Sequence, residues 1–88
     1  MSDSSSWHVY ILECNDNSLY TGVTTDLERR LHEHNNSNKG ARYTRARRPV
    51  CMVYYETVSS RSDACKRECA LKKLSATEKR MLVNTAMK

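Results

Sequence analysis

The sequence predicts a single α+β domain, with a three-stranded β-sheet flanked by helices in the order β-β-α-β-α-α. Three patterns support this: two β-rich runs around a short polar break, a later run of β-branched and aromatic residues, and helix-start signals ahead of three periodic segments. A chain of 88 residues holds one domain with a modest core and has no room for two. We therefore expect one domain over residues 7–88 after a polar, disordered lead at 1–6.

The first two runs, HVYILEC and SLYTGV, are separated by the polar break NDN and predict a β-hairpin. If Cys14 lies opposite Ser18, Tyr10 faces Gly22, and Tyr20 lies on the same side of the sheet. A glycine opposite a tyrosine leaves space for the ring. The hairpin therefore brings two phenols together on one face.

The other face of this hairpin is the more apolar one. It carries Trp7, Val9 and Ile11 on the first strand, with Leu19, Thr21 and Val23 beside them on the second. Side chains alternate between the two faces of a strand. We expect this second face to be the one that packs against helices.

A helix is predicted to follow over residues 26–34. The segment TDLE at 25–28 fits a capping box, with threonine at the cap and glutamate three residues later. Two leucines one turn apart mark the buried side of this helix. Arg30 and His34 form a second pair one turn apart at its margin, where they can reach the phenols of the hairpin.

The second half of the chain predicts one strand and two helices. The run at 50–58 is apolar on both faces, which predicts a central strand with its two tyrosines packed in the core. A helix over 63–74 follows, and Glu68 falls on its apolar stripe. A second capping box, SATE, starts a last helix over 76–85.

Two short motifs resemble the halves of the GIY-YIG nuclease motif. They are VYI at 9–11 and YTG at 20–22, which keep both tyrosines and the glycine but replace the first glycine and the middle isoleucine. Arg30 and His34 fall where that family carries an arginine and a frequent histidine. Glu68 matches its metal-binding glutamate. The resemblance covers most of the chain and is closest to small stand-alone bacterial proteins of the family.

This resemblance implies an endonuclease that hydrolyses phosphodiester bonds in DNA with Mg²⁺ or Mn²⁺. The implied catalytic residues are Tyr10, Tyr20, Arg30, His34 and Glu68, with Gly22 as a structural motif residue. Glu68 would bind the metal, although a surface ion pair with Lys72 is the alternative. Tyr10 is the candidate base, assisted by Arg30, because a free phenol titrates near ~10.

Two roles stay open at this stage. Tyr20 would orient the attacking water or share its proton, and which of the two tyrosines acts as the base is undecided. His34 could relay the proton, but a surface histidine at a helix end is the alternative.

The segment between the first helix and the third strand predicts a nucleic-acid contact. Five cations surround one tyrosine there, at Lys39, Arg42, Tyr43, Arg45, Arg47 and Arg48. The whole chain carries 15 Lys and Arg against 10 Asp and Glu, a formal charge of +5, which suits a polyanion. We expect the cations to contact the backbone and Tyr43 to stack on a base or sugar. A solvated basic loop is the alternative.

A second function class competes with the nuclease. With no room for a targeting domain, we expect selectivity for nucleic-acid structure over sequence, in DNA repair or recombination, with a partner protein as a possible source of target choice. The competing hypothesis is a weakly active or non-catalytic module that binds DNA or RNA. The tyrosines, Arg30 and Glu68 argue for catalysis, since a pure binder gains nothing from a carboxylate that repels phosphate.

The sequence also predicts a cytoplasmic protein. It has no apolar run of the ~18 residues that a membrane span needs, and its N-terminus lacks the features of a signal peptide. Four cysteines would be reduced in that compartment. We assign them to packing or to exposed thiols, because no Cys-x-x-Cys pair predicts zinc.

Overall fold

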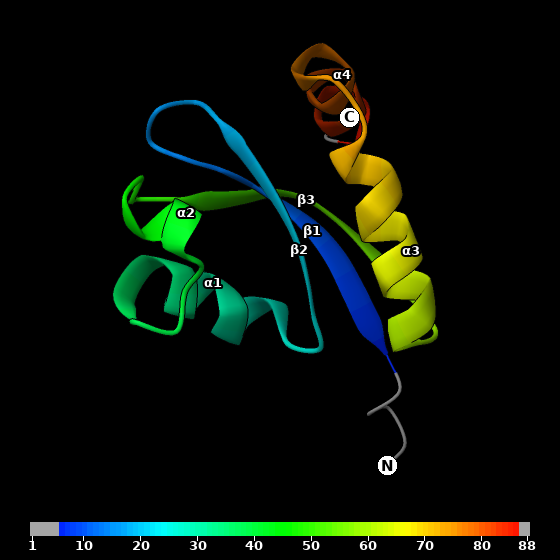
Figure 1. Cartoon of the computed structure of the whole chain (residues 1–88), viewed down its shortest axis with the longest axis horizontal. Coiled ribbons are helices and arrows are strands. Elements are labelled where there is room, and N and C mark those ends of the chain that lie inside the picture. The colour runs from blue at the N-terminus through cyan, green and yellow to red at the C-terminus, as the bar shows by residue number, and fades with distance from the viewer. Residues whose placement is uncertain (1–5, 87–88) are drawn as a thin grey trace.

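The computed structural model describes residues 6–86, so most of the predicted lead at 1–6 lies outside the described residues. The elements follow the predicted α+β order, with one short helix added (Figure 1). They are β1 (Trp7–Glu13), β2 (Leu19–Thr24), α1 (Leu27–Asn36), α2 (Arg42–Arg45), β3 (Cys51–Val58), α3 (Arg61–Lys72) and α4 (Ala76–Ala86). The added helix, α2, lies in the segment that was expected to contact nucleic acid, where no helix was predicted.

The sheet is antiparallel throughout and has the order β2-β1-β3. The hairpin register is as predicted: Tyr10 pairs with Gly22, and Leu12 pairs with Tyr20. The prediction of a central third strand is wrong, because β3 lies at an edge and Tyr55 is 58% exposed. Apolar composition reports strand propensity and partial burial, and it does not fix the order of strands in a sheet.

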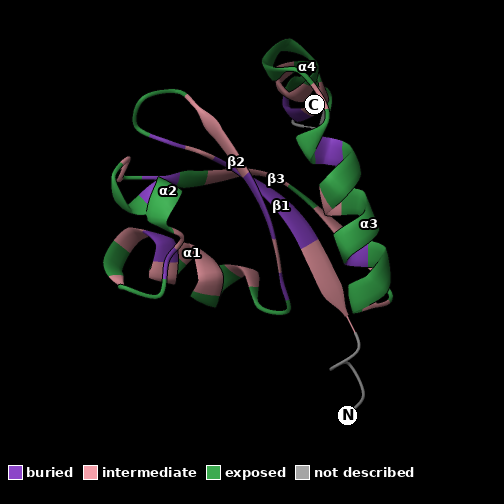
Figure 2. Cartoon of the chain, in the orientation of Figure 1, coloured by how far each residue is buried: buried purple, intermediate pink, exposed green. Residues whose placement is uncertain are grey.

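The central strand is β1, and both of its faces are buried (Figure 2). Val9 packs with Ala64 and Leu71 of α3 on one face. Tyr10 and Leu12 pack on the other face, against the leucines of α1. The prediction that the Val9 face packs against helices is confirmed, but the phenol face is covered as well.

Local capping fixes where the helices begin. The α1 helix is capped by Asp26, whose side chain accepts from the backbone N–H of Arg29, and not by the threonine before it. The predicted second capping box is confirmed, since Ser75 and Glu78 exchange side-chain to backbone hydrogen bonds of 2.9 and 3.1 Å.

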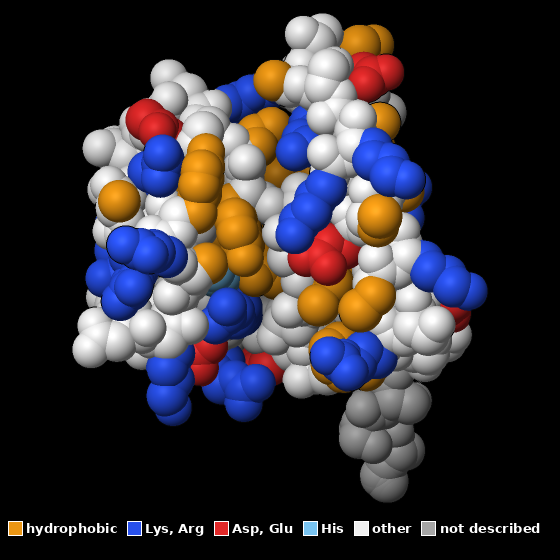
Figure 3. Space-filling view, in the orientation of Figure 1, with side chains coloured by type: hydrophobic (Ala, Val, Ile, Leu, Met, Phe, Trp, Pro, Cys, Tyr) orange, Lys and Arg blue, Asp and Glu red, His pale blue; other side chains and the backbone are white. Residues whose placement is uncertain are grey.

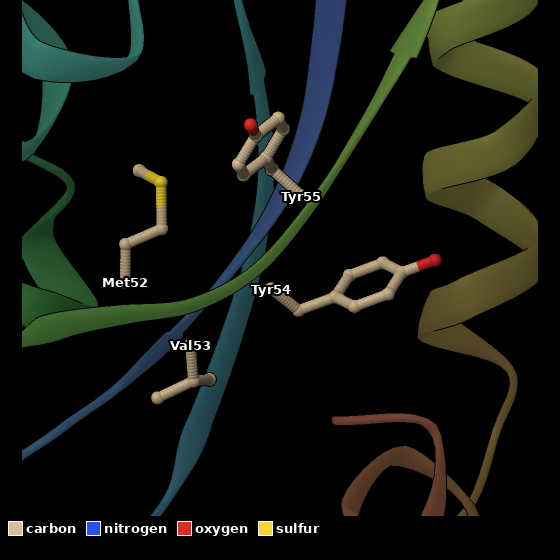
Figure 4. A pocket seen from close by; sticks show the side chains of 4 residues that line it. All are labelled: Met52, Val53, Tyr54 and Tyr55. Carbon is tan, nitrogen blue, oxygen red and sulfur yellow. The ribbon is translucent and has the colours of Figure 1, made fainter. Parts of the chain in front are cut away.

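A pocket of about 330 Å³ lies beside β3 and is lined by Met52, Val53, Tyr54 and Tyr55 (Figure 4). Tyr54 extends toward α3, and its hydroxyl donates to Glu56, which Arg67 holds. Of the other lining residues, Met52 and Val53 are apolar and Tyr55 is exposed. Across residues 6–86 no helix is both long and apolar enough to span a membrane.

Candidate active site

Tyr10 lies across Gly22 at the edge strand β2. A Cβ atom at position 22 would come within 2.5 Å of the Tyr10 hydroxyl oxygen and 2.7 Å of the adjacent ring carbon. Real Cβ atoms do not approach so closely, so this position requires glycine. The phenol itself is buried, with 1% of its surface exposed. The prediction that Gly22 leaves space for the Tyr10 ring is therefore confirmed. The Tyr10 hydroxyl lies over β2 at this glycine.

His34 forms a hydrogen bond with the Tyr10 hydroxyl. The Tyr10 oxygen lies 2.8 Å from His34 Nε2, and His34 Nδ1 lies 2.7 Å from Thr44 Oγ1. His34 is fully buried, so the alternative of a surface histidine is wrong. Gly40 permits this packing, because a Cβ there would lie 2.7 Å from the Glu33 carbonyl oxygen and 2.8 Å from His34 Cα.

Burial sets the charge of this pair. Burial raises the pKa of Tyr10 to about 12, although the adjacent Arg30 guanidinium lowers it through a hydrogen bond and its charge. Burial lowers the pKa of His34 to about 4, and the cations Arg30 and Arg48 act in the same direction against an opposing Glu33. At neutral pH the phenol is therefore protonated and the imidazole is neutral.

Arg30 is held at the rim of this cluster. Its Nη1 donates to Glu33 Oε1 at 3.0 Å and to the backbone carbonyl of Lys39 at 2.9 Å. The guanidinium also lies near enough to the Tyr10 hydroxyl to lower the pKa of Tyr10. The side chain is partly exposed, so a planar guanidinium with a fixed direction faces both the phenol and the solvent.

Tyr20 and Tyr43 extend the cluster toward the surface. The Tyr20 ring centre lies 5.4 Å from that of His34, and the Tyr43 ring stacks on Tyr20 with centres 6.0 Å apart. The Arg47 guanidinium carbon lies 3.8 Å from the centre of the Tyr43 ring. Tyr43 therefore already has two stacking partners, which limits the ring face left for a base or sugar.

Glu68 lies on α3 between the buried Ala64 and Leu71, which pack with Val9. Its side chain is 23% exposed, and its charge raises the pKa of Tyr10. Lys72 Nζ lies 3.1 Å from Glu68 Oε2, so the predicted ion pair is present. Within residues 6–86 no three His, Cys, Asp or Glu side chains gather around a point. A single hard carboxylate suits Mg²⁺, which takes one or two carboxylates and completes its shell with water and substrate phosphate.

The predicted nucleic-acid segment divides into two groups. Arg48 caps the end of α1, donating to the carbonyl oxygens of His34 and Ser37 at 2.5 Å each. Arg47 pairs with Asp16 at 3.0 Å. The other three cations are exposed at Lys39, Arg42 and Arg45. These three are the cations of the segment that remain free to meet a substrate.

Figure 3 shows one face of the molecule, in the orientation of Figure 1. Hydrophobic side chains run along its middle, Lys and Arg side chains lie on both sides, and an acidic spot lies on the α3 side. In the same orientation, β2 crosses the front of the sheet with α1 and α2 on one side and α3 on the other (Figure 1). The basic side chains of the α3 side were not part of the predicted interface.

Thr44 and Gly40 also escaped sequence reasoning. Thr44 lies in the segment that was interpreted from its cations alone. Its side chain points inward because α2, which was not predicted, forms there. Gly40 offered a usable signal, because the chain has only 2 glycines and the other one already marked a close approach.

The fold and this arrangement define a class: the chain belongs to the GIY-YIG family of nuclease domains. The family model for the GIY-YIG catalytic domain matches residues 6–81. Among named relatives, a UPF0213 protein of Desulfotalea psychrophila is 58% identical over 87 residues, covering 99% of this chain and 79% of its own.

Two solved structures are similar as well, both solution NMR structures. The UPF0213 protein BH0048 of Bacillus halodurans has 45% identity and a TM-score of 0.58, covering 91% of this chain and 84% of that one. The protein EF2693 of E. faecalis has 44% identity and a TM-score of 0.62, covering 100% and 94%. The chain is thus similar to small GIY-YIG proteins, several of which carry the UPF0213 name.

Proposed function

We propose that this protein is a divalent-metal-dependent endonuclease that hydrolyses phosphodiester bonds in DNA. The observation that carries the proposal is the gathering of Tyr10, His34 and Arg30 around one buried hydrogen bond, and the charge of Glu68 raises the pKa of the same phenol. Phosphodiester hydrolysis needs a proton acceptor, positive charge at the phosphate and stabilisation of the leaving oxygen. These side chains supply the first two directly.

The proton leaves the attacking water through Tyr10 and His34. As the water oxygen bonds to phosphorus, its proton passes to the Tyr10 oxygen, and the phenol proton passes to His34 Nε2 at 2.8 Å. No free phenolate forms, which matters because the pKa of Tyr10 is about 12. Tyr20, whose ring is less buried, orients the water. Burial of Tyr10 is the observation that favours Tyr20 as the rival base.

The remaining residues handle the phosphate. Arg30 contacts the phosphate oxygens with the guanidinium edge that faces solvent, and so stabilises the charge that grows in the transition state. Glu68 would hold a Mg²⁺ or Mn²⁺ ion, which supplies Lewis-acid stabilisation of the phosphate and the leaving oxygen when bound. Lys72 must release the carboxylate for this, at small cost, because the pair is partly exposed.

We propose a preference for branched or single-stranded DNA over particular sequences, as in repair or recombination. The exposed cations Lys39, Arg42 and Arg45 contact phosphates, which carry no sequence information by themselves. A partner protein could supply target choice. The rival function is a module that binds DNA or RNA without cutting, and the ion pair between Lys72 and Glu68 is the observation that favours it.

A cleavage panel tests this proposal. The protein is incubated with single-stranded, duplex and branched DNA and with RNA, with Mg²⁺, with Mn²⁺ and with chelator. We expect metal-dependent cleavage of DNA, and we expect Glu68→Gln to lose it by roughly 10²–10⁴-fold while binding persists. Glu28→Gln, an exposed glutamate at the start of α1, is the matched control and should cut normally. Binding without cleavage in every condition would instead identify the non-catalytic module.

A further inference from the structure

Thr44 is buried beside His34 without any role in the reaction described so far. It is fully buried, and its hydroxyl oxygen lies 2.7 Å from His34 Nδ1 and 2.9 Å from the carbonyl oxygen of Ala41. A buried threonine hydroxyl with two short contacts has only one proton to give. The acceptor of the Thr44 proton therefore determines which nitrogen of His34 carries the imidazole proton.

The carbonyl oxygen of Ala41 fixes the direction of the Thr44 hydrogen bond. A carbonyl oxygen only accepts, so the Thr44 hydroxyl donates to Ala41. The Thr44 oxygen must then accept at its second short contact, which places the imidazole proton on His34 Nδ1. The backbone N–H of Ala41 also approaches Nδ1, but at 3.4 Å this contact is much weaker than the one at 2.7 Å.

The other end of the imidazole gives the same answer. Arg30 has no acceptor and meets the Tyr10 oxygen only as a donor. The phenol proton therefore goes to the other close partner, His34 Nε2, at 2.8 Å. Nε2 must be unprotonated to receive it. The tautomer that the Thr44 contact requires therefore also gives the buried Tyr10 hydroxyl an acceptor.

We propose that Thr44 is a positioning residue that holds His34 in the tautomer with its proton on Nδ1, so that Nε2 is free to accept from Tyr10. The inference rests on the proposed function, because it assigns a direction to the proton transfer described there. Thr44 lies on α2, the helix that also carries the exposed Arg42 and Arg45. One short helix thus presents the proposed phosphate contacts outward and the tautomer-setting hydroxyl inward.

The direct test is ¹⁵N NMR of the imidazole of His34 in the full chain, without metal or substrate. We expect the wild type and Thr44→Ser to show a protonated Nδ1 and an unprotonated Nε2, and Thr44→Val to lose this preference. Thr57→Val is the matched control, because Thr57 makes the same kind of contact, at 2.9 Å, to His8 outside the site. It should leave the His34 signals unchanged.

Two results would overturn the inference: a wild-type His34 protonated on Nε2, or a Thr44→Val protein with an unchanged tautomer. The wild-type spectrum decides the first point even if Thr44→Val fails to fold. Single-turnover cleavage adds a second readout, with a loss of roughly 10–100-fold in Thr44→Val and recovery in Thr44→Ser, the usual cost of losing a group that orients a functional histidine. The NMR result does not require activity, so failure of the nuclease proposal is distinguishable from failure of this one.

Discussion

The two sides of the candidate site are built differently. On the α1 and α2 side, Tyr10, His34 and Thr44 are buried and joined by contacts of 2.7 and 2.8 Å. On the α3 side, Glu68 lies on a mostly exposed helix and forms an ion pair with the exposed Lys72. Buried hydrogen-bonded groups are costly to rearrange, whereas exposed ion pairs contribute little.

The buried side of the site is therefore formed in the free protein, whereas the exposed side is proposed to be completed when substrate binds. In the proposed mechanism, the groups that pass the proton are already in contact before anything binds. The carboxylate would offer one oxygen ligand to a metal, and water and the phosphate of the substrate would supply the others. Changes on the α1 and α2 side should therefore damage both folding and activity, while changes on the α3 side should damage activity alone.

Gly22→Val should have the largest effect on both. The added side chain meets the Tyr10 hydroxyl and ring, so either the ring leaves His34 or the hairpin opens. We expect the free energy of unfolding to fall by about 1–3 kcal/mol and cleavage to fall by more than about 100-fold. Denaturant unfolding and single-turnover cleavage measure the two effects.

Ala70→Val, at an exposed position of α3, is the control and should cost less than about 0.5–1 kcal/mol with normal cleavage. A Gly22→Val protein that cuts and unfolds like the wild type would mean that Tyr10 does not occupy this position in solution.

Within the basic segment, the buried-side cation Arg48 and the exposed cations Arg42 and Arg45 should differ in a smaller effect. Arg48→Ala removes donors from three carbonyl oxygens at the end of α1, so we expect a loss of about 1–3 kcal/mol in unfolding free energy and little change in the salt dependence of DNA binding. The double change Arg42→Ala and Arg45→Ala should do the reverse. Two lost phosphate contacts reduce the slope of log affinity against log salt by roughly 1.8 for duplex DNA.

The salt slope and the unfolding free energy of both proteins are measured in parallel. If the Arg48 variant lost salt dependence and the double variant kept it, the division of the segment into capping and exposed cations would be wrong.

The features that sequence predicted are local ones. The pairing of Tyr10 with Gly22 follows from strand alternation and the length of a tight break, and Glu68 was placed by a helical period. Both signals are contained within a few residues, so they can be read without knowing the rest of the fold. The residue roles carried over from the family resemblance stay predictions.

The features that sequence missed depend on contacts between distant segments. In the sequence, Arg48 cannot be told from the other cations of its segment. In the fold, it donates to the carbonyl oxygen of His34, 14 residues earlier. Thr44 became part of the site only because α2 packs against α1 and turns it inward. The edge position of β3 follows from its pairing with β1, which composition does not encode.

The central claim is that Tyr10, through His34, takes the proton of the attacking water. It is tested by single-turnover cleavage with Tyr10→Phe and Tyr20→Phe between about pH 6 and 9, alongside thermal unfolding. With pKa values of about 12 for Tyr10 and about 4 for His34, neither group changes protonation in this range, so neither should add a step to the wild-type profile.

We predict that Tyr10→Phe lowers the rate by roughly 10²–10⁴-fold, because the ring stays packed but its oxygen is gone, and that Tyr20→Phe lowers it less. Near-normal cleavage by a folded Tyr10→Phe protein, together with loss of cleavage in Tyr20→Phe, would contradict the account and assign the role of base to Tyr20.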